Sequence, residues 1–394
     1  MGALSHLKVL DLSRVLAGPF CTEMLGDLGA DVVKIERPGG GDDTRGGGQP
    51  FTADGMSAYF ASANRNKRSV ALDLKSPEAQ DVIRRLAGRA DVVVENFRTG
   101  HLDRFGLGYD ELSAINPRLV YCSITGFGTT GPRAGEPGYD FLIQAVGGLM
   151  AITGEPGGEP MKVGVAVVDL FAGAFAAVAI LAALVSRGVT GAGQRVDLSL
   201  YDSQLAMLAN VASNHLVSGE PAVRYGNAHA NIVPYETFHA SDGVFALALG
   251  SDGQWLSLCR ELGREDLERD ESLKTNVGRN LARAWLVPAL NEAFGRGTVG
   301  DAIALCRRAG VPAGPVRGVG EALADPQTAA RGMIVEMATA GGPLQMVGSP
   351  LALLGTPPEY RLPPPALGAH THEMLTELGY SSAEIDAISS ATPR

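Results

Sequence analysis

The sequence predicts an α/β fold in which helices cover both faces of a mostly parallel sheet. In the N-terminal half, short apolar or β-branched runs alternate with helical patterns. This alternation is typical of βαβ units, whose strands are parallel. A chain of 394 residues is also too long for one compact core. We therefore expect one large α/β domain and a second, smaller domain.

The expected strands and helices follow in order along the chain. The strands are Lys8–Leu12, Asp31–Glu36, Ser69–Leu74, Asp91–Glu95, Arg118–Ile124 and Gln194–Leu200. The helical patterns between them are Pro19–Leu28, Pro77–Ala87 and Asp110–Ile115. Ligands of parallel sheets bind beyond the carboxyl ends of the strands, so the loops after these strands are the first place to look for a site.

The region after Val223 has a different pattern. It contains one expected strand, Gly243–Gly250, and three amphipathic helical segments, which are Gly253–Leu262, Asn280–Phe294 and Val299–Ala309. The segment Pro357–Pro365 carries five prolines and predicts an extended strap rather than part of a core.

Composition excludes several classes of protein. The net charge of −10 argues against nucleic acid as a partner, because binding to phosphates requires a basic face. The start of the sequence shows no export signal, and the four cysteines have no metal-ligand spacing, so we expect a cytoplasmic protein with reduced thiols and no bound metal. Leu170–Val185 is apolar but short for a membrane span, and it predicts a buried central helix.

Asp169 is the most unusual residue of the chain. It lies between the strand-like run Lys162–Val168 and the sixteen residues Leu170–Val185, none of which is polar. A carboxylate between two apolar segments could cap the helix, accepting hydrogen bonds from its first N–H groups. It could also be a nucleophile that those N–H groups keep ionised. Caps are far more frequent than nucleophiles, and the residues around Asp169 leave both roles open.

Basic residues gather around the ends of the early strands. They are Arg37, Arg65, Lys67, Arg68, Lys75, Arg98 and Arg104. In an acidic chain such a set favours an anionic ligand at the sheet edge over a solvated positive rim. The ligand is not a dinucleotide bound at Gly126-Phe-Gly128-Thr-Thr-Gly131, because Pro132, Gly135 and Pro137 interrupt the helix that should follow.

The chain also contains many short, separate motifs. They include Arg14-Val-Leu-Ala-Gly-Pro19, Lys34-Ile-Glu-Arg-Pro38, Asn66-Lys-Arg-Ser69, Leu72-Asp-Leu-Lys75, Val94-Glu-Asn-Phe-Arg98, Gly126-Phe-Gly128, Gly138-Tyr-Asp140, Gln254-Trp255, Gly310-Val-Pro312 and Arg331-Gly332. These motifs resemble those of the class III CoA transferases, the family of formyl-CoA transferase, carnitine-CoA transferases and α-methylacyl-CoA racemases. The resemblance extends over essentially the whole chain.

The resemblance implies a homodimer of two interlocked chains. A large Rossmann-like, CoA-binding domain would comprise residues 1–200 and 350–394, and a smaller α+β domain residues 225–325. Residues 201–224 and 326–349 would be linkers, and the proline-rich strap would belong to the return of the chain to the large domain.

The resemblance also implies the site residues. Asp169 matches the catalytic aspartate of the family. The implied CoA contacts are Leu16, Ala17, Arg37, Leu72, Asp73, Leu74, Lys75, Asn96, Phe97, Arg98, Arg104 and Tyr139. A mobile lid would include Gly250, Gly253 and Gln254. The candidates for binding the acceptor carboxylate are Arg14, Arg45, Arg65 and His229. CoA and acyl-CoA would be substrates, with no permanently bound cofactor.

Tyr139 decides between two activities within the family. Transferases use the aspartate as a nucleophile, whereas the racemases need a histidine as a second acid or base, in a Gly-His-Asp setting. Here that setting reads Gly138-Tyr139-Asp140. Because the pKa of a tyrosine is about 10, it is a poor base at neutral pH. The resemblance therefore favours a transferase that takes CoA from succinyl-CoA or a similar donor to a small carboxylic acid, with a dicarboxylate preferred. A racemase or a non-catalytic CoA-binding protein is the alternative.

Overall fold

The computed structural model describes residues 2–390, which divide into two compact units. The first comprises residues 2–149, 162–209 and 326–390, and the second comprises residues 150–161 and 210–325. The segments expected as linkers hold regular structure. Residues 201–224 include most of helix α8 (Leu200–Met207) and all of α9 (Ala209–Ser218). Residues 326–349 hold a short helix and a hairpin. Composition alone does not show whether such a segment is a linker or a helix that belongs to a neighbouring unit.

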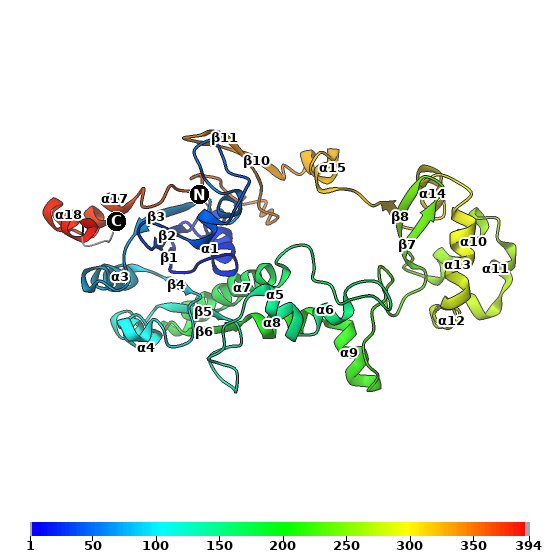
Figure 1. The fold of residues 1–394 in the computed structure, drawn as a ribbon, viewed down its shortest axis with the longest axis horizontal. Coiled ribbons are helices and arrows are strands. Elements are labelled where there is room, and N and C mark those ends of the chain that lie inside the picture. Colours follow the sequence, from blue (N-terminus) through cyan, green and yellow to red (C-terminus); the bar gives the residue numbers. More distant parts are fainter. Residues whose placement is uncertain (1, 391–394) are drawn as a thin grey trace. The chain divides into compact units, whose positions relative to one another are not determined.

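The first unit is built on a sheet of six parallel strands, which confirms the expected α/β class (Figure 1). The strands are β1 (Lys8–Asp11), β2 (Asp31–Glu36), β3 (Lys67–Ala71), β4 (Val92–Glu95), β5 (Val120–Thr125) and β6 (Arg195–Ser199). Their order is β3-β2-β1-β4-β5-β6. Strand β3 begins two residues before the expected Ser69, so Lys67 and Arg68 belong to the strand itself.

Two apolar clusters, one on each face of the sheet, form the core of this unit. Alternate residues of β1 divide between them, with Leu10 in one cluster and Val9 in the other, as the strand period requires. The first cluster includes residues of α3 (Pro77–Arg89), α4 (Tyr109–Ile115), α17 (Thr371–Glu377) and α18 (Ser382–Ser390). The second includes residues of α1 (Ala17–Asp27), α5 (Asp140–Val146), α7 (Val167–Thr190) and α8. Shorter elements of this unit are η1 (Asp43–Gly46), α2 (Ala58–Ala61), η2 (Asp103–Phe105), α16 (Pro326–Ala330), β10 (Ile334–Thr339) and β11 (Gly342–Val347).

The proline-rich strap packs against the first unit without forming a helix or strand. The side chain of Asn66 donates to the backbone oxygen of Glu359 and accepts from the N–H groups of Arg361 and Leu362. The Arg361 guanidinium donates to the backbone oxygens of Gly26 and Ala30. These contacts fix an extended segment, as its prolines predict.

The second unit is an α+β structure with its own apolar core. Its antiparallel sheet contains β7 (Tyr235–Ala240), β8 (Gly243–Ala248) and β9 (Ala313–Pro315). Its helices are α9, α10 (Asp252–Glu261), α11 (Glu265–Arg269), η3 (Glu271–Leu273), α12 (Asn276–Leu281), α13 (Arg283–Phe294), α14 (Val299–Arg308) and α15 (Val319–Leu323), and α6 (Leu149–Ile152) joins the units. The expected helix Asn280–Phe294 is therefore broken into two at Ala282.

Helix α7, which was expected to be a buried central helix, is buried on one face only. Ala172, Ala176 and Ile180 are completely buried, whereas Val178 and Val185 are more than half exposed. Within residues 2–390 it is the one helix long and apolar enough to cross a membrane by length and composition, a test that core helices of soluble proteins also pass. The preceding run Lys162–Val168 is not a strand, because no strand among the described residues pairs with it and its last two residues belong to α7.

Candidate active site

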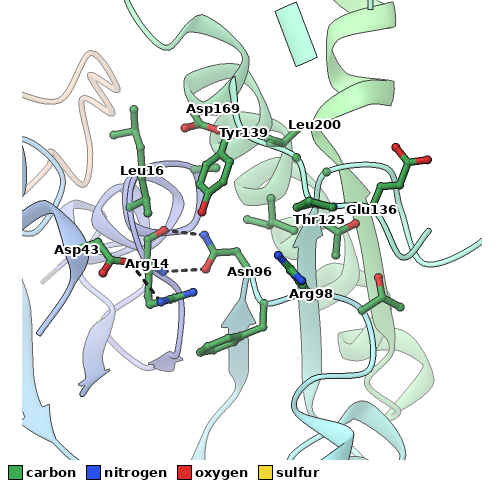
Figure 2. A pocket seen from close by; sticks show the side chains of 18 residues that line it. Arg14, Leu16, Asp43, Asn96, Arg98, Thr125, Glu136, Tyr139, Asp169 and Leu200 are labelled. Atoms are coloured by element: carbon green, nitrogen blue, oxygen red, sulfur yellow. Dashed lines mark hydrogen bonds and ion pairs between the residues drawn. The ribbon is translucent and has the colours of Figure 1, made fainter. Parts of the chain in front are cut away.

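A cavity opens where the strand order of the sheet reverses, between β1 and β4. Parallel sheets bind their ligands at such a point, since the loops there leave in opposite directions. The cavity has a volume of about 140 Å³. Its walls come from the loop after β1, the loop after β4, the end of β5, the segment before α5 and the start of α7 (Figure 2). The predicted residues that line it are Arg14, Leu16, Ala17, Asn96, Phe97, Arg98, Tyr139 and Asp169.

Asp169 is the third residue of α7 and is 9% exposed. It does not cap the helix, which corrects one of its two expected roles. Instead the first turn is capped from α5, where the Asp140 carboxylate accepts a hydrogen bond of 2.8 Å from the Val168 N–H. No residue within 2–390 donates a hydrogen bond to the Asp169 carboxylate. Because Asp140 is distant in sequence, the residues around Asp169 do not show that it caps this helix.

The environment of Asp169 does not keep its carboxylate fully ionised, contrary to the expectation. Burial, reinforced by the negative charge of Asp140, raises the pKa of Asp169 to about 7. At neutral pH the ionised and neutral forms therefore coexist. An ionised carboxylate with little solvation is well suited to nucleophilic attack, because it has few water contacts to lose.

Tyr139 precedes α5 and reaches the cavity with 69% of its surface exposed. Its position depends on a close approach of two glycines. A Cβ atom on Gly126 would lie 2.6 Å from the Cα of Gly138, a distance that side chains do not tolerate. The segments Gly126-Phe-Gly128 and Gly138-Tyr-Asp140 therefore pack backbone against backbone. The glycines place Tyr139 beside the cavity of Asp169 (Figure 2).

A second cavity of about 190 Å³ lies next to the first, and Arg14 and Phe97 line both. It contains six of the predicted CoA contacts: Arg37, Leu72, Asp73, Leu74, Lys75 and Phe97. The Arg14 guanidinium lies 5.0 Å from the centre of the Phe97 ring and pairs with Asp43 at 3.3 Å. Arg104 lies in η2 and lines neither cavity.

Several basic residues of the predicted set hold the fold together instead of facing a ligand. Arg65 precedes β3 and pairs with Asp27 and Glu23, while Lys67 pairs with Asp11; all are buried. The other two are Arg68, which pairs with Asp31, Glu373 and Glu377, and Arg45, which forms two hydrogen bonds with Glu36. Loops before a parallel strand lie at the edge opposite those that follow it, so Arg65, before β3, and Arg37, after β2, lie at opposite edges of the sheet and not at one edge as expected.

The predicted lid residues belong to the second unit. Gln254 accepts a hydrogen bond from the Gly250 N–H at 2.8 Å and donates to the Gly310 oxygen at 2.6 Å. Gly253 is a helical residue of α10 rather than part of a loop. His229 lines a separate cavity of about 350 Å³ within the second unit, and its Nδ1 accepts from the Asn231 N–H.

The described residues hold no cluster of three His, Cys, Asp or Glu side chains that could bind a metal ion. The four cysteines are free and buried. The sequence did not predict that Asp140 caps the helix of Asp169. It also did not predict that two fully buried residues, Lys34 and Asp42, contact the loop after β1. Lys34 alone had a signal, since it is a charged residue inside a predicted buried strand.

Comparisons with known proteins show the family to which the chain belongs. The sequence model of CoA-transferase family III matches residues 4–371. The chain is 46% identical over 381 residues to the succinate–glutarate CoA-transferase of Agrobacterium fabrum, covering 95% of each chain. It is 41% identical over 390 residues to the human succinyl-CoA:glutarate CoA-transferase, covering 98% of this chain and 89% of the human one. A crystal structure of a CAIB/BAIF family protein from Brucella suis matches with a TM-score of 0.83 at 46% identity, covering 96% and 99% of the two chains.

The chain therefore belongs to CoA-transferase family III. The resemblance noted in the sequence is confirmed, and the protein is a CoA-transferase.

Proposed function

We propose that this enzyme moves CoA from succinyl-CoA, or a similar acyl-CoA, to a small dicarboxylate. The names of the two enzymes from Agrobacterium fabrum and human pair glutarate with succinate and with succinyl-CoA, respectively. One observation of the structure supports the proposal most directly. Asp169 lies in a cavity that shares Arg14 and Phe97 with a neighbouring cavity lined by Arg37 and Lys75. The proposed nucleophile thus lies next to a cleft whose cations suit an anionic ligand.

CoA would occupy the second cavity, with its phosphates near Arg37 and Lys75 and its thioester directed towards Asp169. Guanidinium and ammonium groups are the usual partners of phosphates. Arg14 lies between the two cavities, and its Nε atom is buried without a hydrogen-bond partner. With Arg98, which also lines the cavity of Asp169, it is a candidate for binding the second carboxylate of a dicarboxylate acceptor.

The chemistry proceeds through two kinds of covalent intermediate. The Asp169 carboxylate attacks the thioester carbon, the C–S bond breaks, and an aspartyl mixed anhydride and CoA thiolate result. The thiolate then attacks the aspartyl carbonyl, which releases the donor acid and leaves Asp169 as a CoA thioester. The acceptor carboxylate attacks that thioester to form a second anhydride and free the thiolate. Attack of the thiolate on the acceptor's carbonyl yields the new acyl-CoA and restores Asp169.

The racemase alternative finds less support in the site. A racemase needs a second acid or base across the α-carbon from the aspartate. Tyr139 occupies the predicted position of that group, and a phenol is a weak base at neutral pH. A racemase would exchange the α-proton of an acyl-CoA with solvent deuterium in the absence of an acceptor acid, and we expect no such exchange here.

The test is to detect the covalent intermediate. The protein is incubated with succinyl-CoA alone, treated with hydroxylamine and digested, and the peptide containing Asp169 is examined by mass spectrometry. We expect a hydroxamate at Asp169, formed faster as the pH rises through about 7, because only the ionised carboxylate attacks. An unmodified Asp169 peptide under conditions of active CoA transfer would contradict the mechanism. The remaining explanations would be a route without a covalent intermediate or CoA binding without catalysis.

We also propose that two chains interlock as a homodimer. Phe171, Phe175 and Val178 on α7 are each more than a third exposed, as are Phe141 and Leu142 on α5. Apolar patches of this kind mark interaction surfaces. Light scattering should give a mass of two chains, each of 41.0 kDa. A mass of one chain at micromolar concentration would exclude the dimer.

A cytoplasmic location fits the four free, buried cysteines, since reducing compartments keep thiols unpaired. Cell fractionation tests it, and recovery of the protein in the membrane fraction would contradict it.

A further inference from the structure

The loop after β1 contains a strained residue on the wall of the cavity that holds Asp169. Val15 has a φ of 69°, in the left-handed region. A β-branched side chain is a real outlier there, because its Cβ substituents crowd the backbone. Such strain persists only where the surrounding structure holds it in place, and it is concentrated at functional sites.

Side chains from two other loops hold the backbone at Arg14 and at Val15. Asn96, after β4, accepts from the Arg14 N–H at 2.8 Å and donates to the Arg14 oxygen at 2.6 Å (Figure 2). Asp42, after β2, accepts from the Val15 N–H with both carboxylate oxygens, each at 3.2 Å. The backbone is thus fixed immediately before and at the strained residue.

A buried lysine completes this restraint. Lys34 donates to the backbone oxygen of Ser13 at 2.8 Å and pairs with Asp42 at 3.0 Å. Both side chains are fully buried. A buried ion pair is weak evidence for stability, because an apolar pair of similar volume often serves as well. Its contacts with the loop suggest a different purpose.

We propose that Lys34 and Asp42 are positioning residues of the CoA transfer reaction. They hold Val15 in its left-handed conformation, so that Arg14, Leu16 and Ala17 keep their places on the wall of the cavity that contains Asp169. The inference rests on the proposed function of Asp169. It assigns Lys34 and Asp42 no contact with the reacting atoms, and they act through the loop.

Asp42→Asn tests this role. Asparagine keeps one oxygen for the Val15 N–H but loses the second acceptor and the charge that Lys34 needs. We expect kcat for CoA transfer to fall by about tenfold or more, since a shift of the order of 1 Å in a catalytic group can cost about 10²-fold. The KM for acyl-CoA should change less than kcat. The matched control is Asp27→Asn, a buried carboxylate paired with Arg65, which should lower stability and leave kcat unchanged.

Val15→Gly supplies the decisive comparison. Glycine adopts a φ near 69° without strain, so the loop would no longer depend on Asp42. Added to Asp42→Asn, it should restore most of the kcat that Asp42→Asn loses, so the double variant should have nearly the kcat of Val15→Gly alone. If Asp42→Asn does not fold, the double variant is expected to recover both folding and activity.

Two results would overturn the inference. One is a folded Asp42→Asn protein with the wild-type kcat. The other is a double variant that stays as impaired as Asp42→Asn, which would mean that the pair does not act through Val15. Failure of the proposed function is recognised separately, since it would appear as the lack of an Asp169 adduct in the wild-type protein.

Discussion

Asp169→Asn is expected to lower kcat for CoA transfer by about 10³-fold or more, because removing a nucleophile eliminates the covalent route. Asparagine has nearly the shape of aspartate, and Asp169 makes no hydrogen bond that the fold requires within residues 2–390. The variant should therefore fold and bind CoA with a Kd within about threefold of the wild-type value. The rate is measured by following the new acyl-CoA by chromatography, and CoA affinity by calorimetry.

The matched control is Asp31→Asn, at the start of β2, where the carboxylate pairs with Arg68 on the surface. It removes a negative charge of the same kind and should keep wild-type kcat. Asp169→Ala guards against slow deamidation of the asparagine back to aspartate. If both Asp169 variants transferred CoA at the wild-type rate, Asp169 would not be the nucleophile.

Much of the parallel sheet could be predicted because its signal is local. Strand β2 coincides with the expected range Asp31–Glu36, since every residue after the first is buried and the run is bounded by Gly29 and Pro38. Strand β7, by contrast, was missed. Its sequence Tyr-Glu-Thr-Phe-His-Ala is mixed, and only Phe238 is buried. The apolar run Lys162–Val168 resembles a strand in sequence but is not one. A strand also needs a neighbouring strand to pair with, and the sequence does not show whether one is present.

The site shows the same division between local and distant causes. Asp169 stands out as a polar residue between apolar runs, and its cavity lies among the loops after the strands, where a ligand of a parallel sheet was expected. The cap of its helix comes from Asp140, which accepts from the Val168 N–H across 28 positions of sequence, and the raised pKa of Asp169 comes from burial, reinforced by the charge of Asp140. The conformation of Val15 likewise has no signal in the sequence, because valine gives no hint of a positive φ. Such features depend on tertiary contacts alone.

The buried ion pair between Lys67 and Asp11 leads to the largest expected effect on stability. The Lys67 ammonium is fully buried and donates to Asp11 at 3.1 Å, to the Pro19 oxygen at 2.8 Å and to Asn64 at 3.0 Å. Burial alone would raise the pKa of Asp11, but Lys67 and Lys34 outweigh it and lower the pKa to about 2. Asp11 is therefore ionised at neutral pH and depends on these two cations.

Lys67→Met should lower the free energy of unfolding by about 3–5 kcal/mol, because it leaves the Asp11 charge and two oxygens buried without this partner. Methionine fills a similar volume, so little of the loss would come from a cavity. The free energy is measured by urea denaturation at a fixed protein concentration, since assembly would shift the midpoint.

Arg68→Met, at the next position of β3, separates this effect from loss of any cation in the strand. Its partners Asp31, Glu373 and Glu377 are 40%, 53% and 50% exposed, and water can solvate them when the arginine is gone. The expected loss is about 1 kcal/mol or less. If both variants lost the same free energy of unfolding, burial of the ion pair would not determine how strongly its removal destabilises the protein. Partial recovery when Asp11→Asn is added to Lys67→Met would attribute the remainder to the stranded carboxylate charge, since the neutral amide is cheaper to bury.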